Sequence, residues 1–148
     1  MSVTIRPLRD EDFEAWYPLW QGYLTFYKSA VADDVTRHTF ERICDPDGDV
    51  FGFAATEADG RLVGFVTYLF HPFTWSKAPR CYLGDLFTDE NCRGKGVGRA
   101  LIEAVYDAAR EAGAGQVYWL TQEFNYRGRT LYDKVADKTD FIKYSKTL

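Results

Sequence analysis

The chain contains 148 residues, a length typical of one domain, and 46% of them are hydrophobic and 27% charged. This mixture excludes disorder for the bulk of the chain. The 22 acidic and 18 basic residues give a net charge of −4, which argues against a dedicated nucleic-acid-binding protein. We therefore expect residues 1–148 to fold as one domain whose core is stable without disulfide bonds.

In the first half of the chain, the apolar spacing alternates between strand and helix patterns. The first predicted helix carries a run of aromatic side chains at helical spacing, and the second must end before the Asp-Pro-Asp-Gly turn at 45–48. The predicted elements are a strand at 3–6, a helix that Asp10 caps, a helix from Asp33 or Asp34, and strands at 50–56 and 62–70.

The second half alternates strands and helices more regularly. Its predicted elements are a strand at 80–88, an amphipathic helix at 96–112, a strand at 116–121, a helix at 125–135 and a last strand at 141–146. The complete order is β-α-α-β-β-β-α-β-α-β. It predicts an α/β (α+β) fold with one mixed sheet of six to seven strands and about four flanking helices.

Three cysteines without a CxxC pair predict neither a disulfide framework nor a structural zinc site. The two histidines follow no ligand spacing, so no metal is expected. The longest apolar run, residues 63–70, is far shorter than the roughly twenty residues of a membrane helix. These features together predict a cytoplasmic protein that binds no membrane.

Three alternating glycines, Gly94, Gly96 and Gly98, stand where a predicted strand turns into the helix at 96–112. Glycine permits positive φ and lets a ligand approach the backbone closely. The first amides of a helix lack internal acceptors and carry the positive end of its dipole. The turn therefore has the features of a phosphate or diphosphate site.

Basic side chains add positive charge to this turn, namely Arg93, Lys95 and Arg99. The Walker A string does not occur, and the dinucleotide fingerprint would need a glycine at Arg99. A glycine-rich turn with solvated basic residues is the alternative interpretation. The strand before the turn and the long helix after it favour phosphate binding.

The segment Arg-Gly-Lys-Gly-Val-Gly at 93–98 resembles the coenzyme A signature of the Gcn5-related N-acetyltransferases. Residues 82–88 look like the central strand of that family, 117–120 like the strand after its pyrophosphate helix, and 125–132 like its Asn-to-Tyr helix. The resemblance covers essentially the whole chain and is strong from 80 to 132. It is closest to the diamine acetyltransferases and to small relatives that acetylate histones, polyamines or amino acids.

The resemblance implies that acetyl-CoA is the cosubstrate and binds between the central strand and the next one. It also implies that Tyr132 lies near the thioester sulfur, where a phenol can protonate the leaving thiolate. The residues that it implies for cofactor binding are Leu86, Phe87, Thr88, Arg93, Gly94, Lys95, Gly96, Val97, Gly98, Arg99 and Asn125.

The attacking amine must be neutral, so the enzyme must also accept a proton. Asp85 is the candidate base, acting through water, and an equal alternative is a structural carboxylate bonded to backbone or to a tyrosine. The diamine acetyltransferases carry Glu where this chain has Gly84. That difference leaves the base and the acceptor contact open, and it leaves room for a bulkier acceptor.

Tyr23 and Tyr27, at the end of the first predicted helix, are candidates to line the acceptor pocket. The sequence thus favours an N-acetyltransferase that acts on a small primary amine, such as a polyamine or an amino acid, by direct transfer. A lysine acetyltransferase of proteins and a non-catalytic acyl-CoA sensor are the alternatives. Members of the family often pair, so we expect a homodimer.

Overall fold

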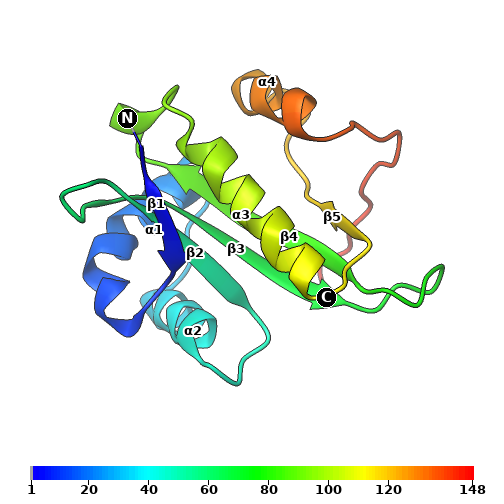
Figure 1. The fold of residues 1–148 in the computed structure, drawn as a ribbon, viewed down its shortest axis with the longest axis horizontal. Coiled ribbons are helices and arrows are strands. Elements are labelled where there is room, and N and C mark those ends of the chain that lie inside the picture. Colours follow the sequence, from blue (N-terminus) through cyan, green and yellow to red (C-terminus); the bar gives the residue numbers. More distant parts are fainter. Residues whose placement is uncertain (1) are drawn as a thin grey trace.

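The computed structural model describes residues 2–148, which form one sheet with helices on both faces (Figure 1). The strand order is β1-β2-β3-β4-β5, and every pairing is antiparallel except that of β4 with β5. The elements are β1 (Thr4–Pro7), η1 (Asp10–Asp12), α1 (Phe13–Phe26), α2 (Asp33–Cys44), β2 (Phe51–Thr56), β3 (Leu62–His71), β4 (Arg80–Thr88), η2 (Glu90–Cys92), α3 (Val97–Glu111), β5 (Gln116–Tyr118) and α4 (Tyr126–Val135).

The expected order of elements is confirmed through α4 and is wrong after it. Residues 141–146 form no strand, and across residues 2–148 the sheet has five strands instead of six to seven. The strand expected at 116–121 is also shorter, because β5 ends at Tyr118. An edge of three residues offers too little backbone to hold a further strand, so the alternating tail runs without a ladder.

The two faces of the sheet are filled by different kinds of side chain. On the α3 face the core is mainly aliphatic, and its fully buried members include Val63, Val66, Leu101, Ile102 and Val105. On the face of α1 and α2 it is largely aromatic, with Trp16, Trp20, Phe40 and Phe65. The Trp16 and Trp20 rings stack with centroids 5.2 Å apart. Burial of both sets fixes the helices against the sheet.

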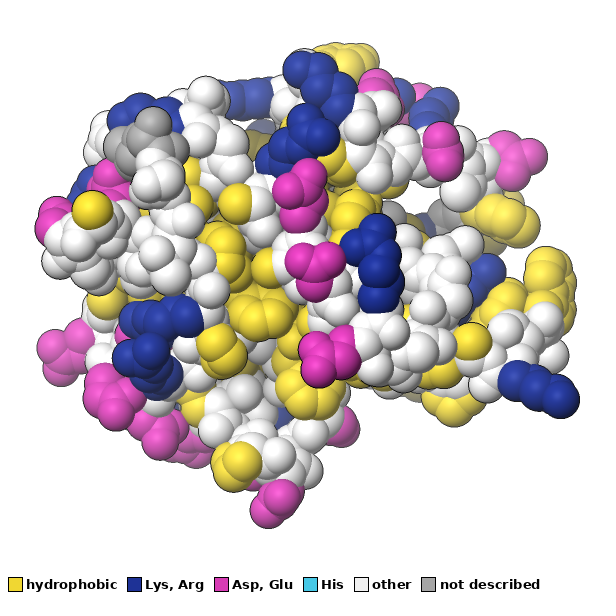
Figure 2. Space-filling model, in the orientation of Figure 1, with side chains coloured by type: hydrophobic (Ala, Val, Ile, Leu, Met, Phe, Trp, Pro, Cys, Tyr) yellow, Lys and Arg dark blue, Asp and Glu magenta, His cyan; other side chains and the backbone are white. Residues whose placement is uncertain are grey.

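The amphipathic pattern expected at 96–112 is confirmed in α3. Its apolar stripe is buried, and its outer side carries Arg99, Glu103, Asp107 and Arg110. Figure 2 shows acidic and basic side chains in a row along this helix, with apolar side chains gathered beside it over the sheet. The helix is therefore held to the sheet by one stripe, and Gly94, Lys95 and Gly96 before its first turn are exposed.

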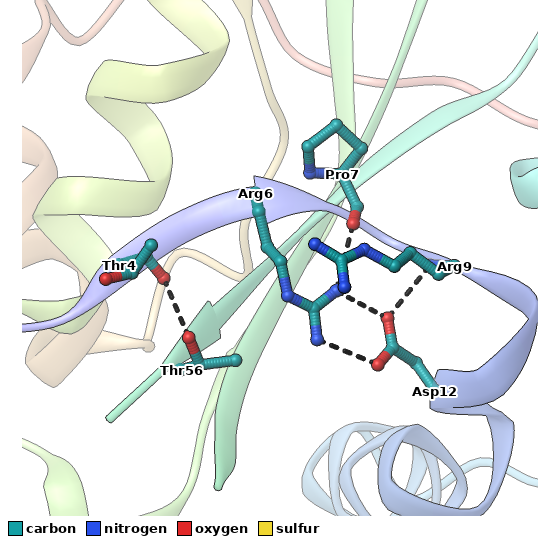
Figure 3. Close-up of polar contacts among 6 residues, drawn as sticks. All are labelled: Thr4, Arg6, Pro7, Arg9, Asp12 and Thr56. Carbon is teal, nitrogen blue, oxygen red and sulfur yellow. Dashed lines mark hydrogen bonds and ion pairs between the residues drawn. The ribbon is translucent and has the colours of Figure 1, made fainter. Parts of the chain in front are cut away.

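A bidentate ion pair fixes β1 to the start of α1 (Figure 3). The Arg6 guanidinium donates to both oxygens of Asp12, at 2.7 and 2.9 Å, and the Arg9 N–H donates to the same carboxylate at 2.8 Å. Burial alone would raise the pKa of Asp12, but the hydrogen bonds from Arg6 and Arg9 outweigh burial and hold this pKa below its ordinary value. The contact determines how α1 leaves the sheet.

Candidate active site

The sheet opens where β4 passes β5. Pairing between these strands ends at Tyr82 and Tyr118, whereas β4 continues to Thr88. Beyond Tyr82 the backbone on this edge of β4 has no ladder partner in β5. Backbone groups in such a position can bind a ligand that enters between the strands.

A β-bulge lies in β4 next to this opening. The register with β3 shifts so that Thr67 is opposite Asp85 while Tyr68 is opposite Leu83. Gly84 is the additional residue between them. A bulge changes the phase of side-chain alternation and can re-aim a side chain at a functional site.

The bulge places Tyr82 and Asp85 on the same face of the sheet although three positions separate them. Leu83 and Leu86 instead pack into the core beneath α3. The Asp85 carboxylate accepts a hydrogen bond from the Thr67 hydroxyl at 2.5 Å. One carboxylate is thereby presented toward α1, at the side of the opening.

Glycine allows α1 to approach β4 closely. A Cβ on Gly22 would lie 2.8 Å from Cζ of Phe87, nearer than side-chain carbons normally approach. The next residue, Tyr23, is consequently placed beside Asp85. Burial and then the negative charge of Asp85 raise the pKa of Tyr23 far above its ordinary value. The same two causes raise the pKa of Tyr82.

A cavity of about 310 Å³ passes through the opening between β4 and β5. Tyr23 in α1 and Tyr27 directly after this helix line it on one side, and Trp119 and Tyr132 line it from the side of α4. A small molecule on the α1 face therefore has access to a group held on the opposite face. The other lining residues are Tyr82, Leu83, Gly84, Leu86, Leu120, Thr121, Gln122 and Lys143.

Tyr132 projects from α4 into this cavity. Its ring packs edge-on against Trp119, with centroids 5.5 Å apart, and burial raises the pKa of its phenol to about 12. The Tyr106 hydroxyl donates to the Val135 carbonyl at 2.8 Å and so anchors the end of α4 to α3. A phenol in this state keeps its proton at neutral pH and can donate it.

The turn before α3 has the geometry of an anion site. Gly94 and Gly96 have φ of 81° and 82°, and a Cβ at either position would have no neighbour within 4 Å. Gly96 caps α3 without a side-chain bond, and the first paired amide is that of Ala100, which donates to the Gly96 carbonyl at 3.0 Å. Among residues 2–148, none accepts a hydrogen bond from the backbone amides of 94–99. These amides suit a diphosphate.

The three basic residues of this turn have different surroundings. Arg93 Nε donates to the Thr88 carbonyl at 3.3 Å, and its guanidinium lies 5.4 Å from the centroid of the Phe87 ring. Arg99 pairs with Glu103 at 3.0 Å, and Lys95 is exposed. Arg93 thus fixes the turn to β4, while Lys95 extends into solvent.

Asn125 is the N-cap of α4. Its Oδ1 accepts from the Gly128 amide at 3.2 Å, and its Nδ2 donates to the Thr121 hydroxyl at 2.9 Å. These bonds position Tyr132 relative to the segment after β5. The contact of Asn125 with the cofactor, which the resemblance implies, stays a prediction.

Within residues 2–148, no group of three or more His, Cys, Asp or Glu side chains is arranged to hold a metal ion. No helix in the same range has both the length and the apolar content to cross a membrane. His71, at the end of β3, instead places Nε2 2.8 Å from the Tyr118 hydroxyl.

This geometry agrees with the comparison to known proteins. The model of the acetyltransferase (GNAT) family matches residues 8–136. The chain belongs to this family. This GNAT protein is 39% identical over 145 residues to the D-amino-acid N-acetyltransferase HPA3 of Saccharomyces cerevisiae, with 97% of this chain and 90% of the relative covered.

Two further comparisons extend the relationship. An aminoglycoside N(6')-acetyltransferase type 1 of Stenotrophomonas maltophilia is 32% identical over 119 residues, which cover 78% of this chain and 73% of that protein. The structure of AAC(6')-Iy with a bisubstrate analogue, CoA-S-monomethyl-acetylneamine, has a TM-score of 0.86 at 21% identity, over 100% of this chain and 99% of that one, and supports the fold.

The resemblance stated from the sequence is thereby confirmed, and the protein is an N-acetyltransferase of amines. GNAT enzymes take the acetyl group from acetyl-CoA. The sequence named Tyr23, Tyr27 and Gly84 for the acceptor side and Tyr132 for the thioester, and all four line the cavity. Their roles stay predictions. Sequence reasoning missed Trp119, Lys143 and Thr67, because no local motif marks residues that strand pairing and the path of the tail bring to the site.

Proposed function

We propose that this GNAT protein transfers an acetyl group from acetyl-CoA directly to the primary amine of a small molecule. The cavity between β4 and β5 carries the proposal, because it connects the tyrosines around Asp85 with Tyr132 across the sheet. Its volume of about 310 Å³ is at the small end of ligand pockets. This size favours a compact acceptor over a folded protein.

The chain's own backbone would hold the cosubstrate. Acetyl-CoA supplies the activated acetyl group as a thioester. The amides of 94–99 at the start of α3 bind its diphosphate, and the unpaired edge of β4 at Leu86, Phe87 and Thr88 binds the arm that follows. A backbone N–H on that edge donates to the acetyl oxygen as negative charge develops there.

Two side chains accept and donate the protons of the reaction. A free alkylamine with a pKa near 10.4 is almost fully protonated at neutral pH. Asp85, positioned by the Thr67 hydroxyl, takes the ammonium proton through water and leaves the amine nucleophilic. Tyr132 donates its proton to the departing sulfur, and its high pKa ensures that the proton is present. No covalent acetyl-enzyme is required.

Two measurements test this proposal together. Isothermal titration with CoA should show binding, and thiol release from acetyl-CoA should depend on an amine from a panel of amino acids, polyamines, aminoglycosides and lysine peptides. CoA binding without thiol release for any amine would indicate a sensor. Turnover confined to the peptides would make the protein a lysine acetyltransferase.

We also propose that the protein is a cytoplasmic homodimer. The tail leaves Phe141, Ile142 and Tyr144 exposed, which is unusual for side chains of this type and suits an interface. Cys44, Cys81 and Cys92 are free thiols, as expected in a reducing compartment. Light scattering on the full chain and on a chain ending at 136 tests the proposed dimer, because loss of the tail should give monomers.

A further inference from the structure

The cavity carries a positive charge that the catalytic proposal does not use. Among the residues from 2 to 148 that line it, Lys143 alone has a charged side chain. It comes from the C-terminal tail, and sequence patterns predicted a strand there. All other lining residues are aromatic, apolar or neutral polar. A lone ammonium among such residues is a specificity feature, because it favours an anionic group in a bound ligand.

The path of the tail explains why this side chain is present. The anchor between Tyr106 and Val135 fixes the end of α4, and the chain then returns toward β5 (Figure 1). Phe141, Ile142 and Tyr144 are 82%, 76% and 89% exposed. Lys143 lies between them in sequence and yet lines the cavity. The tail is therefore not held here by burial of its apolar residues.

The charges near the cavity have opposite signs on different elements. Burial, and after it the negative charge of Asp85 on β4, raises the pKa of Tyr23 and Tyr82, as described above. Lys143 contributes a positive charge from the tail. A ligand that carries both an ammonium and a carboxylate can match both groups at once.

We propose that the acceptor is an amino acid whose carboxylate is bound by Lys143 while its amine lies toward Asp85 and the thioester. This inference rests on the proposed function and defines its substrate class. The Lys143 ammonium donates a charge-assisted hydrogen bond to the carboxylate. The aromatic walls formed by Tyr23, Tyr27 and Trp119 accommodate an apolar or aromatic side chain. A diamine would instead bring its second ammonium toward Lys143 and be repelled.

Steady-state kinetics with a matched pair of acceptors test this assignment. Phenylalanine, as each enantiomer, and phenethylamine differ only in the carboxylate. Wild-type enzyme should have a higher kcat/KM with one enantiomer of phenylalanine than with phenethylamine. Lys143→Ala should raise KM for that enantiomer about 10-fold, as expected for loss of a hydrogen bond to a charged group, and leave KM for phenethylamine unchanged. Lys146→Ala removes another tail lysine and should change neither value.

A charge reversal makes the test stricter. Lys143→Glu should raise the KM for phenylalanine further and increase kcat/KM for 1,5-diaminopentane. Lys143→Arg should retain the wild-type preference. Equal KM changes for phenylalanine and phenethylamine in Lys143→Ala would overturn the assignment. So would a wild-type enzyme that uses both acceptors equally well.

Failure of this inference can be separated from failure of the proposed function. Turnover of phenethylamine or diaminopentane without any dependence on Lys143 removes the carboxylate site and leaves the acetyltransferase intact. If no acceptor is turned over, titration of phenylalanine into the CoA complex still tests the site. Lys143→Ala should weaken that binding about 10-fold, and absence of binding to wild type overturns the inference.

Discussion

The two sides of the splayed strand β4 are built on different principles. On the α3 side, the proposed cosubstrate site consists of backbone amides held by an aliphatic core. On the α1 side, the proposed acceptor site consists of side chains from α1, β4, the segment after β5 and the tail. A backbone site depends on local conformation and is specified by a short motif. A side-chain site depends on where distant segments meet, so it can change its substrate without changing the fold.

This contrast can be broken experimentally. Substitutions on the α3 side should alter the affinity of the enzyme for CoA, whichever acceptor is used. Substitutions on the α1 side should alter the KM of the acceptor and leave CoA affinity unchanged. A variant that affected both equally would show that the two sides act as one site.

The largest effect is expected at Tyr132, where the two sides meet. Tyr132→Phe should lower kcat by about 10²–10³-fold, the usual contribution of a general acid, with CoA affinity unchanged within error. Because the pKa of Tyr132 is raised to about 12, wild type should show no loss of activity from this group up to about pH 10. Unchanged kcat in the variant would remove Tyr132 from the chemistry.

The next effect concerns stability, through the ion pair that holds the start of α1 to β1. Asp12→Asn breaks the part-buried pair with Arg6 and should lower the free energy of unfolding by about 2 kcal/mol at neutral pH, measured by urea denaturation. The folded pKa of Asp12 is lowered, so its contribution is complete above the unfolded value near 3.9 and is lost as pH falls through the folded value. The gap between wild type and variant should therefore close below about pH 4.

An exposed pair gives the matched control for that experiment. Arg42 and Asp49 make a similar bidentate contact, at 2.9 and 3.0 Å, with side chains 49% and 74% exposed. Asp49→Asn should change the free energy of unfolding much less than Asp12→Asn, because water screens the exposed pair. Equal losses in the two variants would show that burial does not distinguish these contacts.

A smaller effect is expected on the α3 side. Gly96→Ala puts a Cβ at φ 82°, which costs about 1–2 kcal/mol in the left-handed region and shifts the amides of the turn. CoA affinity should fall about 10-fold by calorimetry, with the acceptor preference unchanged. Gly60→Ala is the control, since Gly60 has φ 86° in a hairpin turn and also no neighbour within 4 Å. It should be destabilised similarly and bind CoA normally.

How much the sequence predicted follows the same division. The turn at 93–98 and the helix after it were predictable, since glycine spacing and a 3.6-residue stripe are local signals. The alternation at 141–146 wrongly predicted a strand, because a strand needs a partner edge and β5 ends at Tyr118. The bulge at Gly84 arises from pairing with β3, which no single segment encodes. Lys143 enters the cavity only because of the path of the tail.

The smallest predicted effect tests the bulge. A Cβ on Gly84 would lie 3.2 Å from Oγ1 of Thr67, the hydroxyl that donates to Asp85. Gly84→Ala should therefore displace that hydroxyl by a few tenths of an ångström and raise the acceptor KM a few-fold, with CoA affinity and stability nearly unchanged. Thr67→Val removes the same hydrogen bond without entering the cavity, so similar kinetics in both variants would trace the effect to Asp85. If only Gly84→Ala is impaired, the added methyl group obstructs the acceptor itself, and the small residue at this position defines the space available to it.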